Sequence, residues 1–91
     1  MPKRTRIEII LDVLDNLARY PDEPLTKIAL YSNLPYDRLV KILDLLESKD
    51  LLRKINDNNR MSYVFTEKGR VLLKEMKRLR YILNDFGLDI L

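Results

Sequence analysis

Two short amphipathic segments separated by Asn33-Leu34-Pro35 constrain the fold of this chain more than any other feature. Asparagine and proline interrupt a helix, and proline suits the first turn of the next one because its missing N–H has no intrahelical partner there. On both sides of the break, apolar residues recur every three or four positions, at Ile28, Ala29, Leu39, Ile42, Leu43 and Leu46. The spacing predicts two helices that share one apolar face, as in a helix-turn-helix over residues 26–49.

The opposite face of the second predicted helix is polar but carries charges of both signs. It consists of Tyr36, Asp37, Arg38, Lys41, Asp44 and Glu47. A DNA-reading helix presents such a face to base edges and phosphates, whereas an ordinary helix presents it to water. Periodicity alone favours the ordinary solvated helix.

A further helix is predicted over residues 6–20, in front of this motif. One apolar stripe and a second one beside it indicate a helix that lies between neighbours. The two stripes contain Ile7, Ile10, Leu11, Leu14, Leu17 and Ala18, and then Ile9, Val13 and Tyr20. Pro21 should end this helix, since the residue before a proline disfavours helical geometry. Thr26 is expected to cap the next helix through its hydroxyl.

After Asp50 the pattern changes to short runs that are typical of β-strands. Residues 51–55 and 61–65 flank the turn-rich cluster Asn56-Asp57-Asn58-Asn59-Arg60, which favours a β-hairpin over residues 51–66. Its buried side should carry Leu51, Leu52, Tyr63 and Phe65. The asparagines either form the turn or contact DNA, and turn formation is favoured. A hairpin directly after a helix-turn-helix is a wing.

The last and longest helix is predicted over residues 67–86, with Thr66 as its cap and Gly87 at its end. Gly69 in the first turn is a poor helix former, which indicates a close backbone approach. Spacings of four and three residues mark a heptad seam at Leu72, Met76, Leu79, Leu83 and Phe86. The seam predicts either packing on the first helix or a homodimer joined as a coiled coil, and the small core favours the homodimer.

Composition narrows the classes of function that remain. The chain has 91 residues, which suit one domain over residues 1–91, and it has neither cysteine nor histidine. The usual proton shuttle, thiolate nucleophile and soft metal ligands are therefore missing, so no enzyme, metal site or cofactor is expected. No apolar run reaches the roughly 20 residues that cross a bilayer. We expect a cytoplasmic, nucleoid-associated protein with no membrane partner and no evident small-molecule substrate.

Positive charge is concentrated at two places, although the net charge is only +3. The first is a short N-terminal arm with Lys3, Arg4 and Arg6. The second lies between Lys68 and Arg80, where six residues are basic and one is acidic. The arm either contacts phosphate or is a solvated terminus, and the basic helix either follows a DNA backbone or keeps that helix soluble.

The order of predicted elements is that of a winged helix: mostly α with a small β-hairpin and a long C-terminal dimerisation helix. Two motifs, Asn33-Leu34-Pro35-Tyr36 and Tyr63-Val64-Phe65-Thr66-Glu67-Lys68-Gly69, resemble the archaeal winged-helix DNA-binding proteins of the Sso10a type. The resemblance covers residues 6–86. It implies binding to double-stranded DNA and an antiparallel coiled-coil dimer formed by the C-terminal helix.

The predicted function is that of a homodimeric DNA-binding protein, either a transcriptional regulator or a nucleoid-type protein. The second helix of the motif would enter the major groove, and the wing would reach the adjacent backbone or minor groove. The candidate DNA-binding residues are Lys3, Arg4, Arg6, Ser32, Asn33, Tyr36, Arg38, Lys41, Lys54, Asn58, Asn59 and Arg60. The alternative is a winged-helix protein-interaction module without direct DNA binding, supported by Asp37, Asp44 and Glu47 on that helix.

Overall fold

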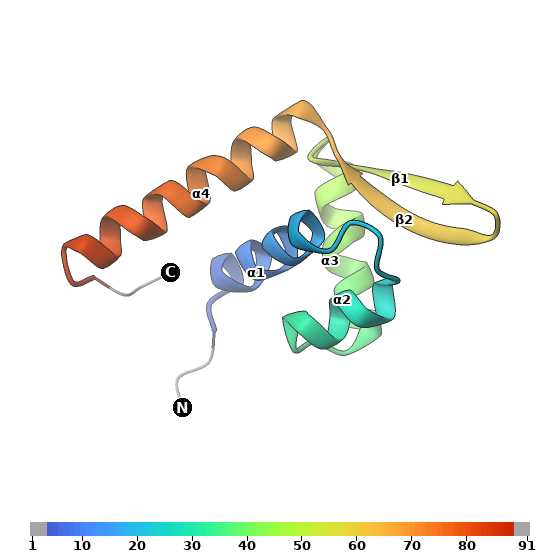
Figure 1. The fold of residues 1–91 in the computed structure, drawn as a ribbon, viewed down its shortest axis with the longest axis horizontal. Helices are drawn as coiled ribbons and strands as arrows, with labels where there is room; N and C mark the ends of the chain where they lie inside the picture. The colour runs from blue at the N-terminus through green and yellow to red at the C-terminus, as the bar shows by residue number, and fades with distance from the viewer. Residues whose placement is uncertain (1–3, 89–91) are drawn as a thin grey trace.

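The computed structural model describes residues 4–88 of the chain. Within this range, four helices and one antiparallel hairpin follow one another in the predicted order (Figure 1). They are α1 (Arg6–Arg19), α2 (Leu25–Ser32), α3 (Tyr36–Ser48), β1 (Leu52–Asp57), β2 (Arg60–Phe65) and α4 (Glu67–Asp85). The predicted fold class, mostly α with a small hairpin and a long C-terminal helix, is therefore confirmed, and the dimerisation of that helix stays a prediction. No helix in residues 4–88 has the length and hydropathy that would let it cross a membrane.

The core lies where α1, α2 and α3 meet, and the base of the hairpin closes it. Both predicted stripes of α1 contribute, because Val13 and Leu14 are fully buried while the helix lies between α4 and the other helices (Figure 1). Leu39 and Leu43 of α3 are also fully buried. Burying a leucine or valine side chain stabilises a fold by about 1.5–3 kcal/mol, so this cluster dominates the stability. Ile7 of α1 is 53% exposed and lies outside the core.

Left-handed residues end three of the helices in the same way. Asn33 has φ of 56° after α2, Asp50 has φ of 62° after α3, and Gly87 has φ of 74° after α4. In each case the next N–H reaches back five residues, as in the bond of 2.9 Å from Leu34 N to Ala29 O. This is the Schellman arrangement, which satisfies carbonyl groups at a helix end. It explains the break at Asn33, and it confirms the predicted helix end at Gly87.

The helix starts differ in part from the predictions. Thr26 does not cap α2, because Pro24 already has the extended geometry of an N-cap (φ −65°, ψ 156°) and its carbonyl accepts the N–H groups of Lys27 and Ile28. The prediction for Thr26 was wrong by two residues. Pro35 is the N-cap of α3 and stands just before the first turn instead of inside it.

The hairpin has a two-residue turn made of Asn58 and Asn59, with φ of 51° and 63°. Asp57 pairs with Arg60 across this turn, and the register runs back to Leu52 opposite Phe65. Two successive positive φ values match the twist of the strands, and asparagine tolerates them well. Turn formation is therefore confirmed for these two asparagines. On the predicted buried side, Leu52 and Tyr63 are buried, whereas Leu51 and Phe65 are half-buried.

The start of α4 is fixed to the turn between α3 and β1. Thr66 caps the helix, since its hydroxyl accepts the N–H of Gly69 at 3.1 Å, and the same hydroxyl donates to the carbonyl of Asp50 at 2.7 Å. The backbone N–H of Thr66 also donates to the carbonyl of Leu51 at 3.2 Å. A Cβ atom on Gly69 would lie 1.9 Å from that same carbonyl oxygen. The predicted cap and the predicted close approach are both confirmed.

Helix α4 runs alongside α1, and its C-terminal turns lie beyond that helix (Figure 1). Leu72, Leu73 and Met76 pack against the core. Further along the helix, large apolar side chains are exposed: Leu79 by 48% and Phe86 by 76%. The helix therefore packs on α1 only in part, and much of its apolar surface has no partner within residues 4–88.

Candidate nucleic-acid interface

Helix α3 presents the residues that were predicted to read DNA. Leu39, Leu43 and Leu46 anchor its inner face, with exposures of 0%, 0% and 3%. Its first two turns expose four of the six residues of the predicted polar face, Tyr36, Asp37, Arg38 and Lys41, whereas Asp44 and Glu47 are half-buried. The core leucines thus fix the orientation of the helix while its N-terminal half stays open to a partner.

One of the acids on α3 points to the wing. The hydroxyl of Tyr63 donates to Oδ1 of Asp44 at 2.6 Å, and Nζ of Lys54 lies 3.2 Å from the same oxygen. Lys54 also lies over the Tyr63 ring, 5.6 Å from its centroid. The Tyr63 hydrogen bond, followed by Lys54, holds the pKa of Asp44 below its usual value, while burial and the carboxylate raise the pKa of Tyr63. Asp44 therefore fixes the hairpin to α3, and its charge is matched by Lys54.

Replacing Tyr63 by phenylalanine should lower the free energy of unfolding by about 1 kcal/mol at pH 7, because a hydrogen bond to a half-exposed carboxylate is lost. Asp44 has a lowered pKa in the folded state, so the contribution is present above its usual pKa of 3.8 and is lost as the pH falls through the folded value. Urea unfolding at pH 7 and pH 3 checks this. The difference between variant and wild type should shrink at pH 3, and an unchanged difference would contradict the assignment.

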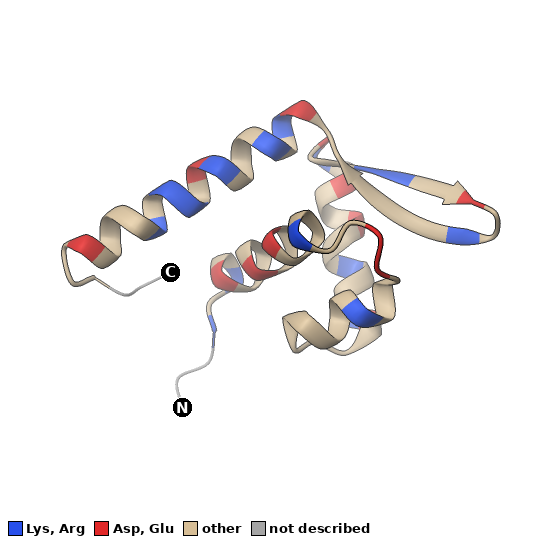
Figure 2. Ribbon diagram, in the orientation of Figure 1, with Lys and Arg blue, Asp and Glu red and all other residues tan. Residues whose placement is uncertain are grey.

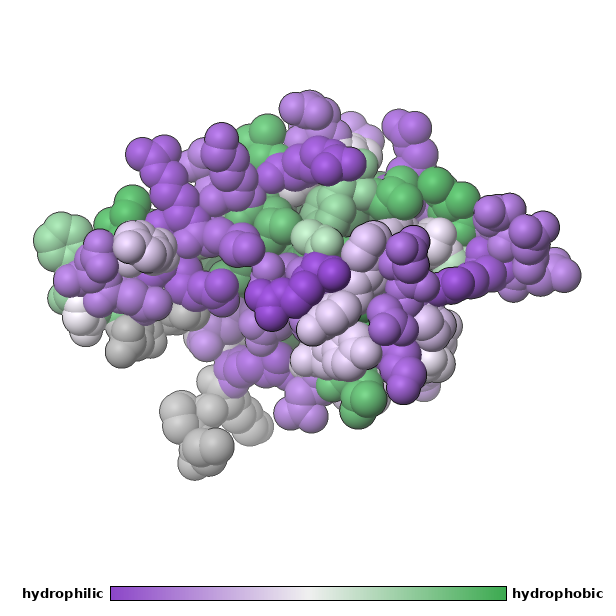
Figure 3. All heavy atoms as spheres, in the orientation of Figure 1, coloured by the Kyte–Doolittle hydropathy of each residue, from purple (hydrophilic) through white to green (hydrophobic). Residues whose placement is uncertain are grey.

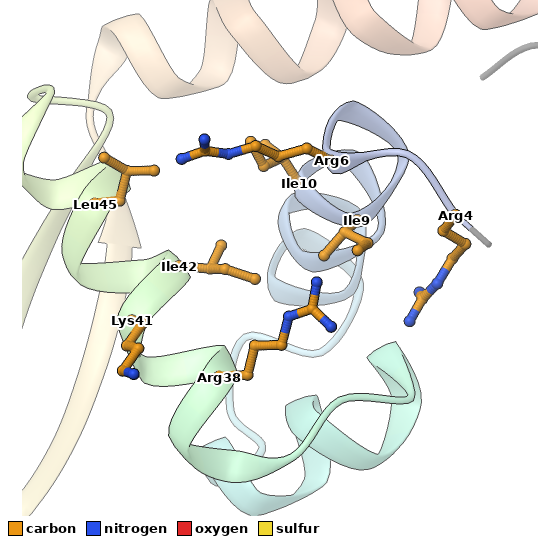
Figure 4. Close-up of a pocket in the computed structure, with 8 residues that line it drawn as sticks. All are labelled: Arg4, Arg6, Ile9, Ile10, Arg38, Lys41, Ile42 and Leu45. Carbon is orange, nitrogen blue, oxygen red and sulfur yellow. The ribbon is translucent and has the colours of Figure 1, made fainter.

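A cluster of cations surrounds a cavity between α1 and α3, with a volume of about 350 Å³ (Figure 4). Arg4 and Arg6 line it from the N-terminal side, and Arg38 and Lys41 line it from α3. Arg38 and Arg6 both extend across the space between the two helices in Figure 4. The structure thus brings four of the predicted DNA-binding residues together in one place.

The N-terminal arm is partly folded onto the helix-turn-helix. The guanidinium of Arg4 pairs with Asp12 at 2.8 Å and donates to the carbonyl of Asn33 at 3.2 Å. Arg6 is the first residue of α1 and stays exposed. Lys3, the remaining predicted residue of the arm, lies outside the described residues. Arg4 is therefore positioned beside the turn that precedes α3.

Ser32 was wrongly included among the predicted DNA contacts. Its side chain is only 1% exposed, and its hydroxyl accepts a hydrogen bond of 3.0 Å from the amide of Asn16 in α1. Ser32 therefore joins α2 to α1 and cannot reach a phosphate. Asn33 is exposed at the turn, as predicted.

At the wing, Asn58, Asn59 and Arg60 are all exposed. One guanidinium nitrogen of Arg60 donates to the carbonyl of Asp22 at 2.5 Å, which ties the wing to the link between α1 and α2. Lys54 is engaged with Asp44 at the base of the wing. The tip of the wing thus exposes the amide groups of Asn58 and Asn59. Both predicted cations of the wing, Lys54 and Arg60, already have a partner inside the domain.

The basic run on α4 is visible along the helix in Figure 2. Lys77 pairs with Asp15 of α1 at 3.1 Å, and Arg78 lies 3.9 Å from Glu75. The other four cations of the run form no ion pair within residues 4–88: Lys68, Arg70, Lys74 and Arg80. Unpaired charges on an extended helix remain available to a polyanion.

The predicted dimer seam lines an apolar groove of about 710 Å³ between α4, α1 and α3. Leu72, Met76, Leu79 and Leu83 contribute from α4, and Ile7 and Ile10 face them from α1. Phe86 lies beyond the groove. Figure 3 also shows hydrophobic side chains at the surface between hydrophilic ones. Four of the five predicted seam residues therefore share one unfilled surface.

Several known proteins with a similar fold are described as DNA-binding proteins. The family model of the winged helix-turn-helix matches residues 3–84. Sso10a-2, a DNA-binding protein from Sulfolobus solfataricus, superposes with a TM-score of 0.77 at 27% identity, over 92% of this chain and 86% of that one. A putative DNA-binding protein from Ralstonia eutropha superposes with a TM-score of 0.62 at 27% identity, and the match covers 75% of this chain and 93% of that one.

More distant structures share the fold alone. MepR of S. aureus, solved as a complex with DNA, gives a TM-score of 0.72 at 17% identity, and the match covers 90% of this chain but 62% of that one. No curated protein matches the chain. The similarity to Sso10a-2 and the family match confirm the resemblance to Sso10a-type proteins, and the chain belongs to the winged helix-turn-helix family.

Proposed function

We propose that this protein is a homodimeric DNA-binding protein, a transcriptional regulator or a nucleoid-type protein. Helix α3 enters the major groove, and the hairpin lies on the adjacent backbone or minor groove. One observation carries the proposal: the open half of α3 presents Arg38 and Lys41, which form no ion pair within residues 4–88, while Asp44 is turned to the wing.

The remaining candidate contacts surround α3. Arg4 and Asn33 lie at its N-terminal side, Arg6 extends across the cavity towards Leu45, and Asn58, Asn59 and Arg60 lie at the wing tip. Contacts from arginine, lysine and amide groups to phosphates fix the register of a protein on DNA, and the contacts to base edges select sequence. We assign selection to Tyr36, Arg38 and Lys41, and positioning to the rest, including Lys54.

The double substitution Arg38→Ala with Lys41→Ala tests the DNA interface. It should weaken binding to a duplex by about 10- to 100-fold and reduce the slope of log affinity against log salt by about 2, since two phosphate or base contacts are lost. Fluorescence anisotropy with a labelled duplex measures both. The matched control is Lys74→Ala with Arg78→Ala, which removes the same charge from α4 and should have a smaller effect.

Equal losses of duplex affinity in the two double variants would indicate general electrostatic attraction to DNA instead of an interface formed by α3. If the α3 variant binds the duplex as well as wild type, the alternative of a protein-interaction module would replace the proposal. That alternative has less support than the sequence suggested, because the carboxylate of Asp44 is hydrogen-bonded to Tyr63 of the wing. Asp37 remains an exposed acid on α3.

The dimer is proposed from the groove and from the unpartnered part of α4. A second copy of α4 on the seam would cover Leu79, which is 48% exposed, and fill part of the groove. Burial of apolar area is worth about 25 cal/mol per Å², so a seam of this kind stabilises association. Alternating spacings of four and three residues fit the knobs and holes of a coiled coil.

Leu79→Lys should convert the dimer to a monomer, because a charge at the seam would have to be buried unpaired. Light scattering measures the mass. Tyr81→Lys places the same charge on an exposed position of the same helix, 71% exposed and outside the groove, and should leave the dimer intact. A mass that is the same for wild type and both variants would refute the seam.

A further inference from the structure

We propose that the cavity between α1 and α3 binds a small organic anion with an apolar body, and that its occupation draws Arg38 away from DNA. The first part stands on the cavity itself, and the second rests on the proposed function. The cavity, of about 350 Å³, falls in the lower part of the range of small-molecule sites, which is about 300–1,000 Å³.

The positive charge around the cavity favours an anionic ligand. Four cations line it, Arg4, Arg6, Arg38 and Lys41, and no acidic residue does. Of these, only Arg4 has an ion pair within residues 4–88, the one with Asp12. Like charges held close together repel one another, and an anion between them removes that cost. A carboxylate also suits the planar guanidinium group, which binds it through two parallel hydrogen bonds.

The remaining walls are apolar, which argues against a bare phosphate. Ile9 is buried, and Ile10, Ile42 and Leu45 are half-buried along the cavity. In Figure 4 Ile42 points from α3 towards α1, between the two arginine side chains that cross the space. An inorganic or DNA phosphate would satisfy the cations and leave these side chains in water, whereas a ring or branched chain would cover them. The best match is therefore a compact aromatic or branched carboxylate.

The position of Arg38 couples this site to DNA. The same guanidinium cannot bind a carboxylate in the cavity and a phosphate or base edge in the groove at once. By linkage, the factor by which the anion weakens DNA binding equals the factor by which DNA weakens anion binding. An anion in the cavity would thus act as an inducer that releases the protein from DNA.

The isoleucines allow a direct test without DNA. The full chain, labelled with ¹³C at isoleucine methyl groups, is titrated with 2-naphthoate and separately with the uncharged 2-naphthamide. Methyl signals of Ile9 and Ile42 should shift with naphthoate, while Ile28 in the core and Ile55 on the wing should not. Ile7 lines only the apolar groove beside α4, so it reports binding there instead.

Arg38→Gln should weaken naphthoate binding by about tenfold or more, since one charge-assisted contact is lost. Arg53→Gln, an exposed change on the wing outside the cavity, should leave it unchanged. Equal binding of naphthamide, shifts at Ile7 without shifts at Ile9 and Ile42, or no binding would overturn the site. Naphthoate that binds in the cavity but leaves duplex affinity unchanged would overturn the coupling. A protein that binds no duplex at all would refute the proposed function and not the cavity site.

Discussion

Replacing Gly69 by alanine should lower the free energy of unfolding by about 3 kcal/mol, the upper part of the usual range for overpacking. Helix propensity alone predicts the opposite sign, a gain of about 1 kcal/mol. The steric clash should outweigh the gain in helix propensity, because the new Cβ would lie 1.9 Å from the carbonyl oxygen and 3.0 Å from the carbonyl carbon of Leu51. These are backbone atoms, so no side-chain rotation relieves the contact, and α4 must move away from the α3–β1 turn.

Urea unfolding followed by circular dichroism, at one fixed protein concentration, measures this difference. Gly87→Ala is the matched control, since nothing lies within 4 Å of its would-be Cβ and only its φ of 74° opposes alanine. Gly87→Ala should lower the free energy of unfolding by about 1–2 kcal/mol, because alanine is strained in the left-handed backbone conformation. A Gly69→Ala protein as stable as wild type would show that the approach of α4 to Leu51 is looser than described.

The affinity for duplex DNA should fall by about 10³ between 50 and 200 mM salt. This follows if each bound unit neutralises about six phosphates and releases their counterions. Arg4, Arg6, Arg38 and Lys41, together with the wing, supply enough cations near α3 for that number. Anisotropy titrations at several salt concentrations give the slope. An affinity that does not change with salt would exclude a phosphate-dominated interface.

Local rules made much of this fold predictable. The left-handed positions at Asn33, Asn58 and Asn59 are occupied by the residue type that tolerates them best after glycine, and the apolar period identified the helices around them. The approach at Gly69 was predictable because glycine is costly in a first turn unless something needs the space. The capping box of Thr5 and Glu8 at the start of α1 was missed, although threonine followed three residues later by glutamate is its signature.

Features that join distant residues were not predictable in this way. Nothing in the pattern of α3 shows that Asp44 meets Tyr63 and Lys54, because their contact depends on how the hairpin packs. The burial of Ser32 was likewise not predictable. A serine at the end of a helix is expected to be exposed, yet Ser32 is buried and hydrogen-bonded to Asn16 of α1. Periodicity identifies buried apolar residues, whereas buried polar residues depend on a partner elsewhere in the chain.

The attachment of α4 at the α3–β1 turn has a geometric consequence for the proposed dimer. Thr66 joins this corner through Asp50 and Leu51, so the corner sets the angle between α3 and α4. A helix of 19 residues is about 28 Å long at 1.5 Å per residue. A change of about 10° at its base would therefore displace its far end by about 5 Å, more than one base-pair step of 3.4 Å. Substitutions at this corner should thus alter the spacing of the two DNA half-sites that the dimer selects, even though the corner itself would touch no DNA.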